Sequence, residues 1–212
     1  MIFWSFGFLR MGTVGLVSYA HGQNDYSEIS NILLRNLLFV LILSITLFMA
    51  QGLILLISLK IFSLSNDTAE LFKQYFKIRI YSAPGELTLY IITGLFIGLQ
   101  KTKVSSFAVG LFSILNIILS VIFVTKYELN IKGVAYGTLL SAITTSVLFL
   151  IYTFQYLNKF SKIKFKIIEL LNIKKIKQIF YLNFNIFIRT ILLTFSFLWF
   201  TYLGSQIGEK YV

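Results

Sequence analysis

The sequence predicts an all-α fold, a polytopic transmembrane helix bundle with about six spans. Hydrophobic residues make up 57% of the 212 residues and charged residues only 13%, a balance that is too apolar for a soluble globular domain. The mean hydropathy of +0.82 supports the same conclusion. Most apolar residues lie in runs that are long enough to cross about 30 Å of hydrocarbon as helices.

The predicted spans are residues 2–19, 33–59, 80–100, 104–125, 133–157 and 179–203. Polar or basic stretches separate them, and we expect loops or turns at 20–31, 60–77, 101–103, 126–132 and 158–178. The first, third and fifth of these loops share one side of the membrane and hold nine Lys and Arg residues, against five in the other two. The positive-inside rule therefore places the first set in the cytoplasm.

The stretch 158–178 is the one candidate domain boundary. Its lysines alternate with Phe, Ile and Leu, a pattern typical of an amphipathic helix on the anionic inner leaflet or of a tether between two bundles. We therefore expect three parts: residues 1–157 with five spans, a basic cytoplasmic linker at 158–178, and residues 179–212 with the first helix of a second bundle.

The composition excludes several functional classes. The chain has no cysteine, and its one histidine, His21, lies in a predicted polar loop, so neither a thiolate metal site nor a catalytic triad can be assembled. No phosphate-binding glycine loop of the Walker type occurs. The formal net charge of +11 lies mainly in the loops rather than in a nucleic-acid-binding module. We expect no enzyme activity, no catalytic residues, no cofactor, no metal and no nucleic-acid partner.

The stretch RIYSAPGELTLYIITGLFIGLQKTK, residues 79–103, carries the main candidate site. It contains the only proline, Pro84, and a carboxylate, Glu86, which lies about 9 Å inside the apolar run at about 1.5 Å per residue. We expect an ionisable group at that depth to face the bundle interior or a wet cavity. A polar stripe at helical spacing, which predicts a solute pathway, is made of Ser82, Glu86, Tyr90, Thr93 and Gln100.

Other polar groups interrupt the apolar runs. Arg10 either pairs with Glu86 to close a cavity or extends to the nearer headgroup layer, and the second interpretation also fits Arg189. Asn116 and Ser120 form an i, i+4 polar pair, which either lines a cavity or bonds to neighbouring helices and to the backbone.

Three residues of the third span have structural interpretations. Gly94 and Gly98 have the small-xxx-small spacing that lets helices approach closely. Pro84 frees a backbone carbonyl one turn earlier, so it is a candidate hinge.

Five stretches carry a family resemblance. They are, in chain order, FWSFGFLRMGTVGLVSYAHGQND, RIYSAPGELTLYIITGLFIGLQKTK, LNIILSVIFV, NIKGVAYGTLLS and LNFNIFIRTILLTFSFLWFTYLGSQIG. They resemble the second, fourth, fifth, sixth and seventh helices of the DinF-like branch of the multidrug and toxic compound extrusion (MATE) family. The similarity extends over essentially the whole chain.

The resemblance implies a multidrug exporter with two six-helix lobes and alternating access. It implies efflux of small organic, cationic solutes across the bacterial inner membrane, with H⁺ or Na⁺ as the coupling ion. Residues 1–157 would be the first lobe without its first helix, and residues 179–212 would begin the second lobe. We therefore expect membrane lipids as partners, together with a complementary chain or a second copy that supplies the missing helices.

The resemblance also identifies candidate binding residues. Asn116 takes the Asn position of the fifth helix, Ser120 stands where many members have Asp, and Thr138 matches a hydroxyl of the sixth helix. Asn185 stands where the seventh helix often has Asp. The aspartate of the first helix has no counterpart here, so we expect Glu86 to supply a substitute charge.

Two alternatives to the exporter remain at this point. One is a lipid-linked saccharide flippase of the same superfamily, which requires a more cationic cavity for a pyrophosphate. The other is a non-transporting product of a decayed or truncated gene.

Overall fold

A computed structural model describes residues 6–62, 66–160 and 173–207. Over these ranges every regular element is a helix, which confirms the predicted all-α fold. The elements are α1 (Phe8–Gly22), α2 (Tyr26–Phe62), α3 (Asn66–Arg79), the 3-10 turn η2 (Ile80–Ser82), α4 (Ala83–Gly98), α5 (Thr102–Thr125), α6 (Asn130–Asn158) and α8 (Ile173–Ile207).

Within the described ranges, five helical stretches are long and apolar enough to cross a membrane: Tyr26–Lys60, Asn66–Gly98, Thr102–Thr125, Asn130–Asn158 and Ile173–Phe197. Each contains most of one predicted span. The remaining predicted span, at 2–19, corresponds to α1, which is 15 residues long where it is described. The structure thus agrees with a bundle of five to six transmembrane helices.

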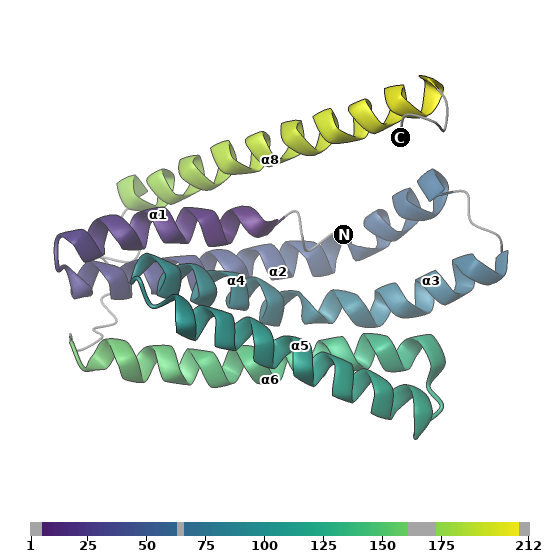
Figure 1. Ribbon diagram of the computed structural model, residues 1–212, viewed down its shortest axis with the longest axis horizontal. Coiled ribbons are helices and arrows are strands. Elements are labelled where there is room, and N and C mark those ends of the chain that lie inside the picture. The colour runs from purple at the N-terminus through teal and green to yellow at the C-terminus, as the bar shows by residue number, and fades with distance from the viewer. Residues whose placement is uncertain (1–5, 63–65, 161–172, 208–212) are drawn as a thin grey trace.

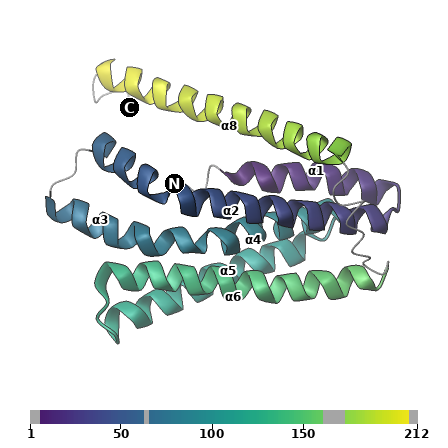
Figure 2. The same cartoon turned by 180° about the vertical axis from the view of Figure 1, so that it is seen from behind.

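The long helices lie side by side, with α8 at one edge of the bundle and α5 and α6 at the other (Figures 1 and 2). The α1–α2 turn, the α4–α5 turn, the end of α6 and the start of α8 lie together at one end of the bundle. We refer to this end as the basic end, since it holds the two turns that the sequence predicts to be cytoplasmic and the described lysines next to them.

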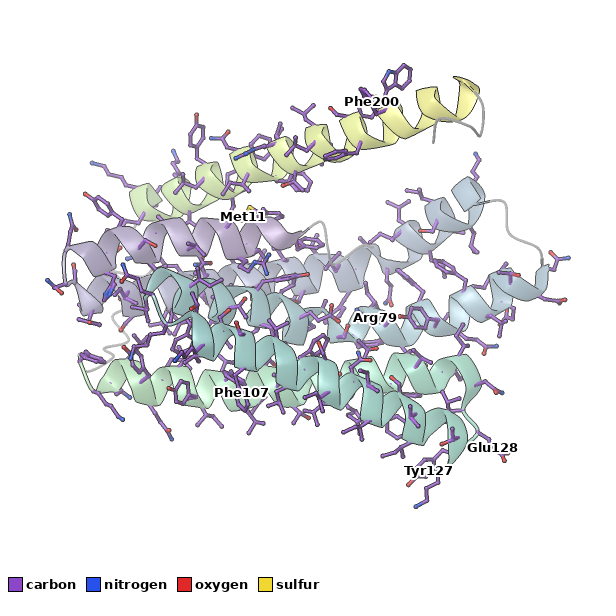
Figure 3. All side chains as sticks on the ribbon, viewed as in Figure 1. Met11, Arg79, Phe107, Tyr127, Glu128 and Phe200 are labelled. Carbon is purple, nitrogen blue, oxygen red and sulfur yellow. The ribbon has the colours of Figure 1, made fainter. Side chains whose placement is uncertain are left out.

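Helix α4 lies at the centre of the bundle and contacts α1, α2, α5 and α6. Within Asn66–Gly98, 72% of the apolar window is buried, against 6% within Thr102–Thr125. The outer surface is apolar as well: Met11, Phe107 and Phe200 are all more than half exposed, and Phe200 projects from the outer side of α8 in Figure 3. In a membrane, lipid chains would cover this surface.

The predicted loop at 20–31 is wrong in its extent, because α1 continues to Gly22 and α2 begins at Tyr26. The polar residues that suggested a loop start a helix instead. The Asp25 carboxylate accepts a hydrogen bond of 2.9 Å from the backbone N–H of Glu28, which is the contact that an N-cap residue makes.

The predicted loop at 60–77 is also wrong, because α2 continues to Phe62 and α3 occupies Asn66–Arg79. Phe76 is buried in the core, so the charged residues of α3 belong to an amphipathic helix rather than to a loop. Helix α3 continues through η2 into α4. The predicted third span is therefore the second, C-terminal half of a longer helical segment.

The predicted linker at 158–178 falls largely outside the described residues, since 161–172 are not described. The interpretation as an amphipathic surface helix concerns that part. The last residues of the predicted linker form the first turns of α8, which begins at Ile173.

Candidate functional site

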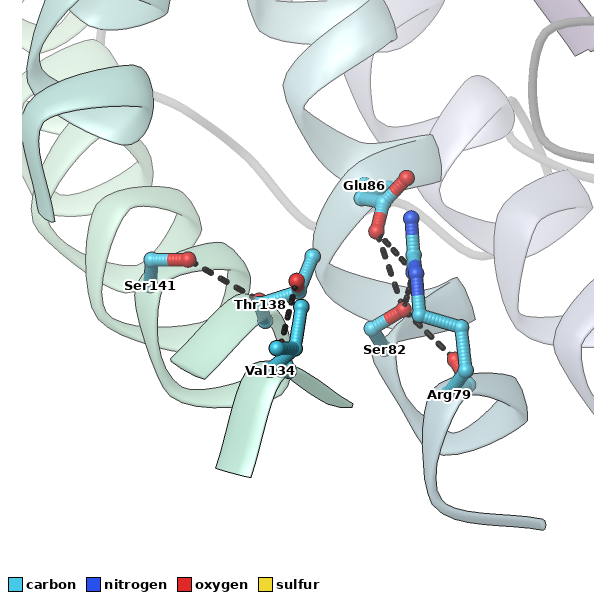
Figure 4. A network of polar contacts seen from close by, with 6 residues as sticks. All are labelled: Arg79, Ser82, Glu86, Val134, Thr138 and Ser141. Carbon is cyan, nitrogen blue, oxygen red and sulfur yellow. Dashed lines mark hydrogen bonds and ion pairs between the residues drawn. The ribbon is translucent and has the colours of Figure 1, made fainter. Parts of the chain in front are cut away.

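Glu86 belongs to a polar cluster at the junction of α3, η2 and α4 (Figure 4). It forms an ion pair with Arg79, whose Nη1 donates to Glu86 Oε1. Ser82 Oγ lies 2.9 Å from the same carboxylate oxygen and 2.7 Å from the Arg79 carbonyl oxygen. The side chains of Glu86 and Arg79 are only 11% and 18% exposed. The buried carboxylate is therefore compensated within its own helical segment, as a buried charge requires.

A cavity of about 240 Å³ lies beside this cluster, between α1, α4 and α5. The residues that line it are Arg10, Glu86, Leu89, Tyr90, Thr93, Val109, Phe112 and Ser113. Helix α1 approaches α4 closely here because Gly94 has no side chain: a Cβ at this position would lie 2.6 Å from the Arg10 carbonyl oxygen. This contact places Arg10 beside the cavity.

The hypothesis of an Arg10–Glu86 ion pair is wrong for this structure. Both residues line the cavity, but the ion pair of Glu86 is with Arg79. Arg10 is exposed and forms no hydrogen bond or ion pair with any residue in the described ranges. The cavity therefore holds one compensated carboxylate and one additional positive charge.

The predicted polar stripe of α4 is present in part. Tyr90 and Thr93 line the cavity together with Glu86, and the Thr93 hydroxyl donates to the Leu89 carbonyl at 2.7 Å. Gln100 is not part of the stripe, because it lies in the turn after α4 with a left-handed φ of 59°.

Asn116, Ser120 and Thr138 are not among the residues that line this cavity. Ser120 Oγ contacts Asn116 Oδ1 at 3.4 Å. It also lies where α5 and α6 cross, since a Cβ on Gly137 would lie 2.7 Å from the backbone nitrogen of Ser120. The Thr138 hydroxyl donates to the Val134 carbonyl at 3.0 Å (Figure 4). The structure places these three residues in or beside a helix–helix contact.

The other candidate residues are placed as follows. Pro84 lies at the start of α4, directly after the 3-10 turn. Gly98 faces α1, because a Cβ there would lie 2.8 Å from the Cβ of Val17. Arg189 and Asn185 are both exposed on α8.

Arg79 is the functional candidate that the sequence interpretation missed. It begins the stretch 79–103, where the sequence predicts only a basic end of the third span. The available signal was the spacing of Arg79, Ser82 and Glu86 at i, i+3 and i+7, which puts all three on one helix face. A buried link between Asn36 and Thr13, with 3.2 Å between Nδ2 and Oγ1, was also not anticipated, because it joins two different helices.

A second charged cluster lies at the basic end of the bundle. Glu28 on α2 uses both carboxylate oxygens: Oε1 lies 2.9 Å from Arg35 Nη1, and Oε2 lies 2.6 Å from Lys175 Nζ on α8. These three residues border a cavity of about 230 Å³. The cluster ties α8 to the helices that precede the linker.

Among the described residues, no group of three or more His, Cys, Asp or Glu side chains could hold a metal ion. The Glu86 cluster offers a charge pair between one carboxylate and one guanidinium. Apolar helices of membrane-spanning length around a charged cavity define a polytopic membrane protein of the transporter class.

The chain belongs to the MatE family, whose sequence model matches residues 1–122. It is 26% identical over 205 residues to DNA damage-inducible protein F of Escherichia coli (strain K12), covering 97% of this chain and 44% of that protein. These matches confirm the resemblance stated above for a partial chain.

Solved structures show the same fold. One is the crystal structure of a point mutant of MATE, with a TM-score of 0.82, 21% identity, and coverage of 98% of this chain and 46% of that one. Another is a multidrug resistance MATE family transporter of the MOP superfamily in its inward-facing conformation, with a TM-score of 0.66, 26% identity, and coverage of 72% and 34%. The chain spans less than half the length of these relatives. The matches do not favour the flippase alternative.

Proposed function

We propose that this chain forms the first lobe and the start of the second lobe of an exporter of small organic, cationic solutes. The exporter works by cation-coupled antiport and alternating access across the bacterial inner membrane. Membership in a transporter family supports the class of function, and it argues for transport rather than for enzyme activity. The coupling ion is H⁺ or Na⁺, and no other cofactor is required.

The observation that carries this proposal is the Arg79–Glu86 pair beside the cavity. When Glu86 is ionised, an organic cation in the cavity competes with Arg79 for the same carboxylate. Tyr90 and Phe112 line this cavity as well, and their rings offer faces that attract cations. The cavity can thus bind a cation only while Glu86 carries its charge.

Protonation of Glu86 would weaken the binding of an organic cation in the cavity. Glu86 is the one carboxylate among the described residues that line the cavity, and Arg10 lines it too. With Glu86 neutral, the charges of Arg10 and Arg79 would repel a bound cation, because Coulomb interactions are strong where water is excluded. Proton uptake would then expel the solute, which is the exchange that an antiporter needs.

The proposed exporter needs more helices than this chain supplies. The chain covers 44% of the length of its relative from Escherichia coli, and among the described helices α8 packs mainly against α1. We propose that a complementary chain, a second copy or a continuation of the same chain completes the second lobe and covers the polar cavity. Membrane lipids surround the assembly.

The test of the proposed function is dye efflux from cells that lack their own exporters. This chain would be compared with a version completed by the parts of the Escherichia coli relative that it does not cover. We expect the completed version to export a cationic dye, and export by the short chain would mean that it assembles a pathway by oligomerising. If neither exports although both are in the membrane, the proposed function is wrong.

The role of Glu86 has its own prediction. Glu86→Gln in the transport-competent version should lower cationic dye export roughly tenfold or more, since loss of one buried charge contact is worth more than the ~1.4 kcal/mol per tenfold change. Glu70→Gln is the matched control, because Glu70 is 61% exposed and pairs only with Lys73 on the surface of α3. Normal export with normal membrane levels would leave Glu86 a structural residue.

A further inference from the structure

A third cavity, separate from the proposed coupling site and from the cavity at Glu28, lies on the outer face of the α5–α6 pair. It is an apolar groove of about 470 Å³ near the basic end of the bundle. Its lining is Lys103, Val104, Phe107, Leu111, Leu148, Phe149 and Tyr152. We refer to these residues as the α5–α6 groove.

The α5–α6 contact changes along its length. Around Gly137 the two backbones are in contact, as the Ser120 nitrogen lies 2.7 Å from where a Cβ would be. Toward the basic end, large side chains replace the glycines, and the rings of Phe107 and Phe149 are 6.1 Å apart. Phe107 is 67% exposed, and it lies at the α5–α6 edge of the bundle in Figure 3.

Two lysines lie at the end of the groove. Lys103 lines it directly. Lys101 Nζ lies 4.4 Å from the ring centroid of Tyr156, and that ring stacks on Tyr152 of the groove at 6.5 Å. Both lysines are exposed, and neither forms an ion pair with a residue in the described parts of the chain.

The groove has the dimensions of an acyl-chain site. Lys103 and Leu111 are eight residues apart on α5, so the groove extends about 12 Å into the apolar part of the bundle at about 1.5 Å per residue. Apolar side chains line the groove over this length, and the lysines lie at its basic end. A basic pocket between transmembrane helices at the cytoplasmic side is a setting in which proteins hold anionic lipid headgroups.

We propose that the α5–α6 groove binds one anionic phospholipid of the cytoplasmic leaflet. An acyl chain lies along Phe107, Leu111 and Phe149, and the headgroup phosphate lies against Lys103 and Lys101. Charge complementarity selects this occupant over a second copy of the chain. A two-fold contact across the groove would bring Lys103 of each copy together, and like charges at such a contact are unfavourable.

The test is lipid retention by the purified, delipidated chain in detergent, measured by native mass spectrometry. Dioleoylphosphatidylglycerol and dioleoylphosphatidylcholine would be added in equal amounts. We expect one phosphatidylglycerol molecule to be retained about tenfold better than phosphatidylcholine. Lys103→Gln should reduce that preference several-fold, and Lys101→Gln should reduce it less, since Lys101 is one ring further from the groove.

Matched controls lie at the other ends of the same two helices. Lys126 and Lys132 are also exposed, so Lys126→Gln and Lys132→Gln should leave phosphatidylglycerol retention unchanged. Leu111→Trp, which fills the groove without removing a charge, should lower retention of the phospholipid. Ile118→Trp places the same ring on an exposed position of α5 and should not.

Three outcomes would overturn the proposal. Equal retention of the two lipids would show that the lysines do not select a headgroup. Equal losses from Lys103→Gln and Lys132→Gln would show only a general charge effect. A dimer that Leu111→Trp abolishes, with no retained lipid, would make the occupant a second copy of this chain. None of these results depends on transport, so the proposed export function can fail or stand separately.

Discussion

The molecule contains two carboxylate–arginine pairs with the same spacing and different surroundings. Arg79 and Glu86 are seven residues apart on the α3–α4 segment, and Glu28 and Arg35 are seven apart on α2. In the first pair the nearby third charge, Arg10, lines the same cavity without an ion pair to the carboxylate. In the second, Lys175 from α8 closes on Glu28 at 2.6 Å.

The two charged clusters therefore differ in position. The Arg79–Glu86 pair lies beside a cavity, and the Glu28 cluster connects α8 to the preceding helices. Both members of the Arg79–Glu86 pair lie within one helical segment, and a second arginine lines the adjacent cavity. Glu28 also pairs within one helix, with Arg35 on α2, but its second carboxylate oxygen contacts Lys175 of α8. Contacts among α1 to α6 should therefore resist change more than contacts between these helices and α8. The proposed exporter, in which α8 begins a second lobe that moves against the first, needs this ranking.

The largest effect is expected for Arg79→Gln, because it leaves the Glu86 carboxylate buried without its partner. Removing one member of a buried ion pair costs about 3 kcal/mol or more, and the midpoint of thermal unfolding should fall by about 6 to 12 °C for a chain of this length. Adding Glu86→Gln should restore much of the loss, because the uncompensated charge is then gone. An unchanged midpoint in Arg79→Gln would show that the pair does not hold the segment together.

Gly94→Ala is expected to have the next largest effect. The added Cβ would lie 2.6 Å from the Arg10 carbonyl oxygen and 3.0 Å from the Thr13 Cβ, so the α1 backbone itself must move. Such overpacking costs about 1–3 kcal/mol, which exceeds the gain in helix propensity of up to ~1 kcal/mol. Unfolding of the purified chain measures this loss. A stabilised variant would contradict the close α1–α4 contact.

Glu28→Gln should have a smaller effect on the docking of α8, because Glu28 is 22% exposed and its partner on α8, Lys175, is 44% exposed. We expect the loss of the Lys175 contact to cost about 1 kcal/mol; the same variant also removes the ion pair of Arg35, which is 4% exposed, within α2. The chain has no native cysteine, so Ile179→Cys, at a position that is 6% exposed, can report docking through its rate of maleimide labelling. Glu28→Gln should raise this rate several-fold. Glu86→Gln should leave the labelling rate unchanged. An equal rise from both variants would show that the two charged clusters affect the docking of α8 alike.

Periodicity in the sequence predicted the helices well and their ends poorly. Apolar runs identify spans because a membrane admits little else at that depth. Polar stretches such as 20–31 and 60–77 were interpreted as loops, whereas Asp25 caps a helix and the charges of α3 belong to an amphipathic one. Polarity alone does not distinguish a loop from a solvated or capped helix end.

The candidate site was predicted in part. Glu86 and Arg10 do line one cavity, since both were identified as charges inside apolar runs. Arg79 was missed, and Asn116 and Ser120 proved to lie apart from that cavity, near the α5–α6 crossing. Which polar residues face each other depends on how each helix is rotated about its axis, and that rotation is set by glycine contacts such as Gly94 with Arg10 and Gly137 with Ser120.

The smallest effect is expected for Gly12→Ala, on the face of α1 that meets α8. A Cβ there would lie 2.3 Å from Asn183 Oδ1, but the nearest atoms all belong to the end of that rotatable side chain. The amide can turn away, and the helix propensity gained offsets the adjustment, so stability should change by less than about 1 kcal/mol. The matched comparison is Gly94→Ala at the α1–α4 contact, where backbone atoms of α1 are in the way. If Gly12→Ala proves as destabilising as Gly94→Ala, the α1–α8 contact is as rigid as the α1–α4 contact, which would contradict the proposal that α8 moves against the preceding helices along this face.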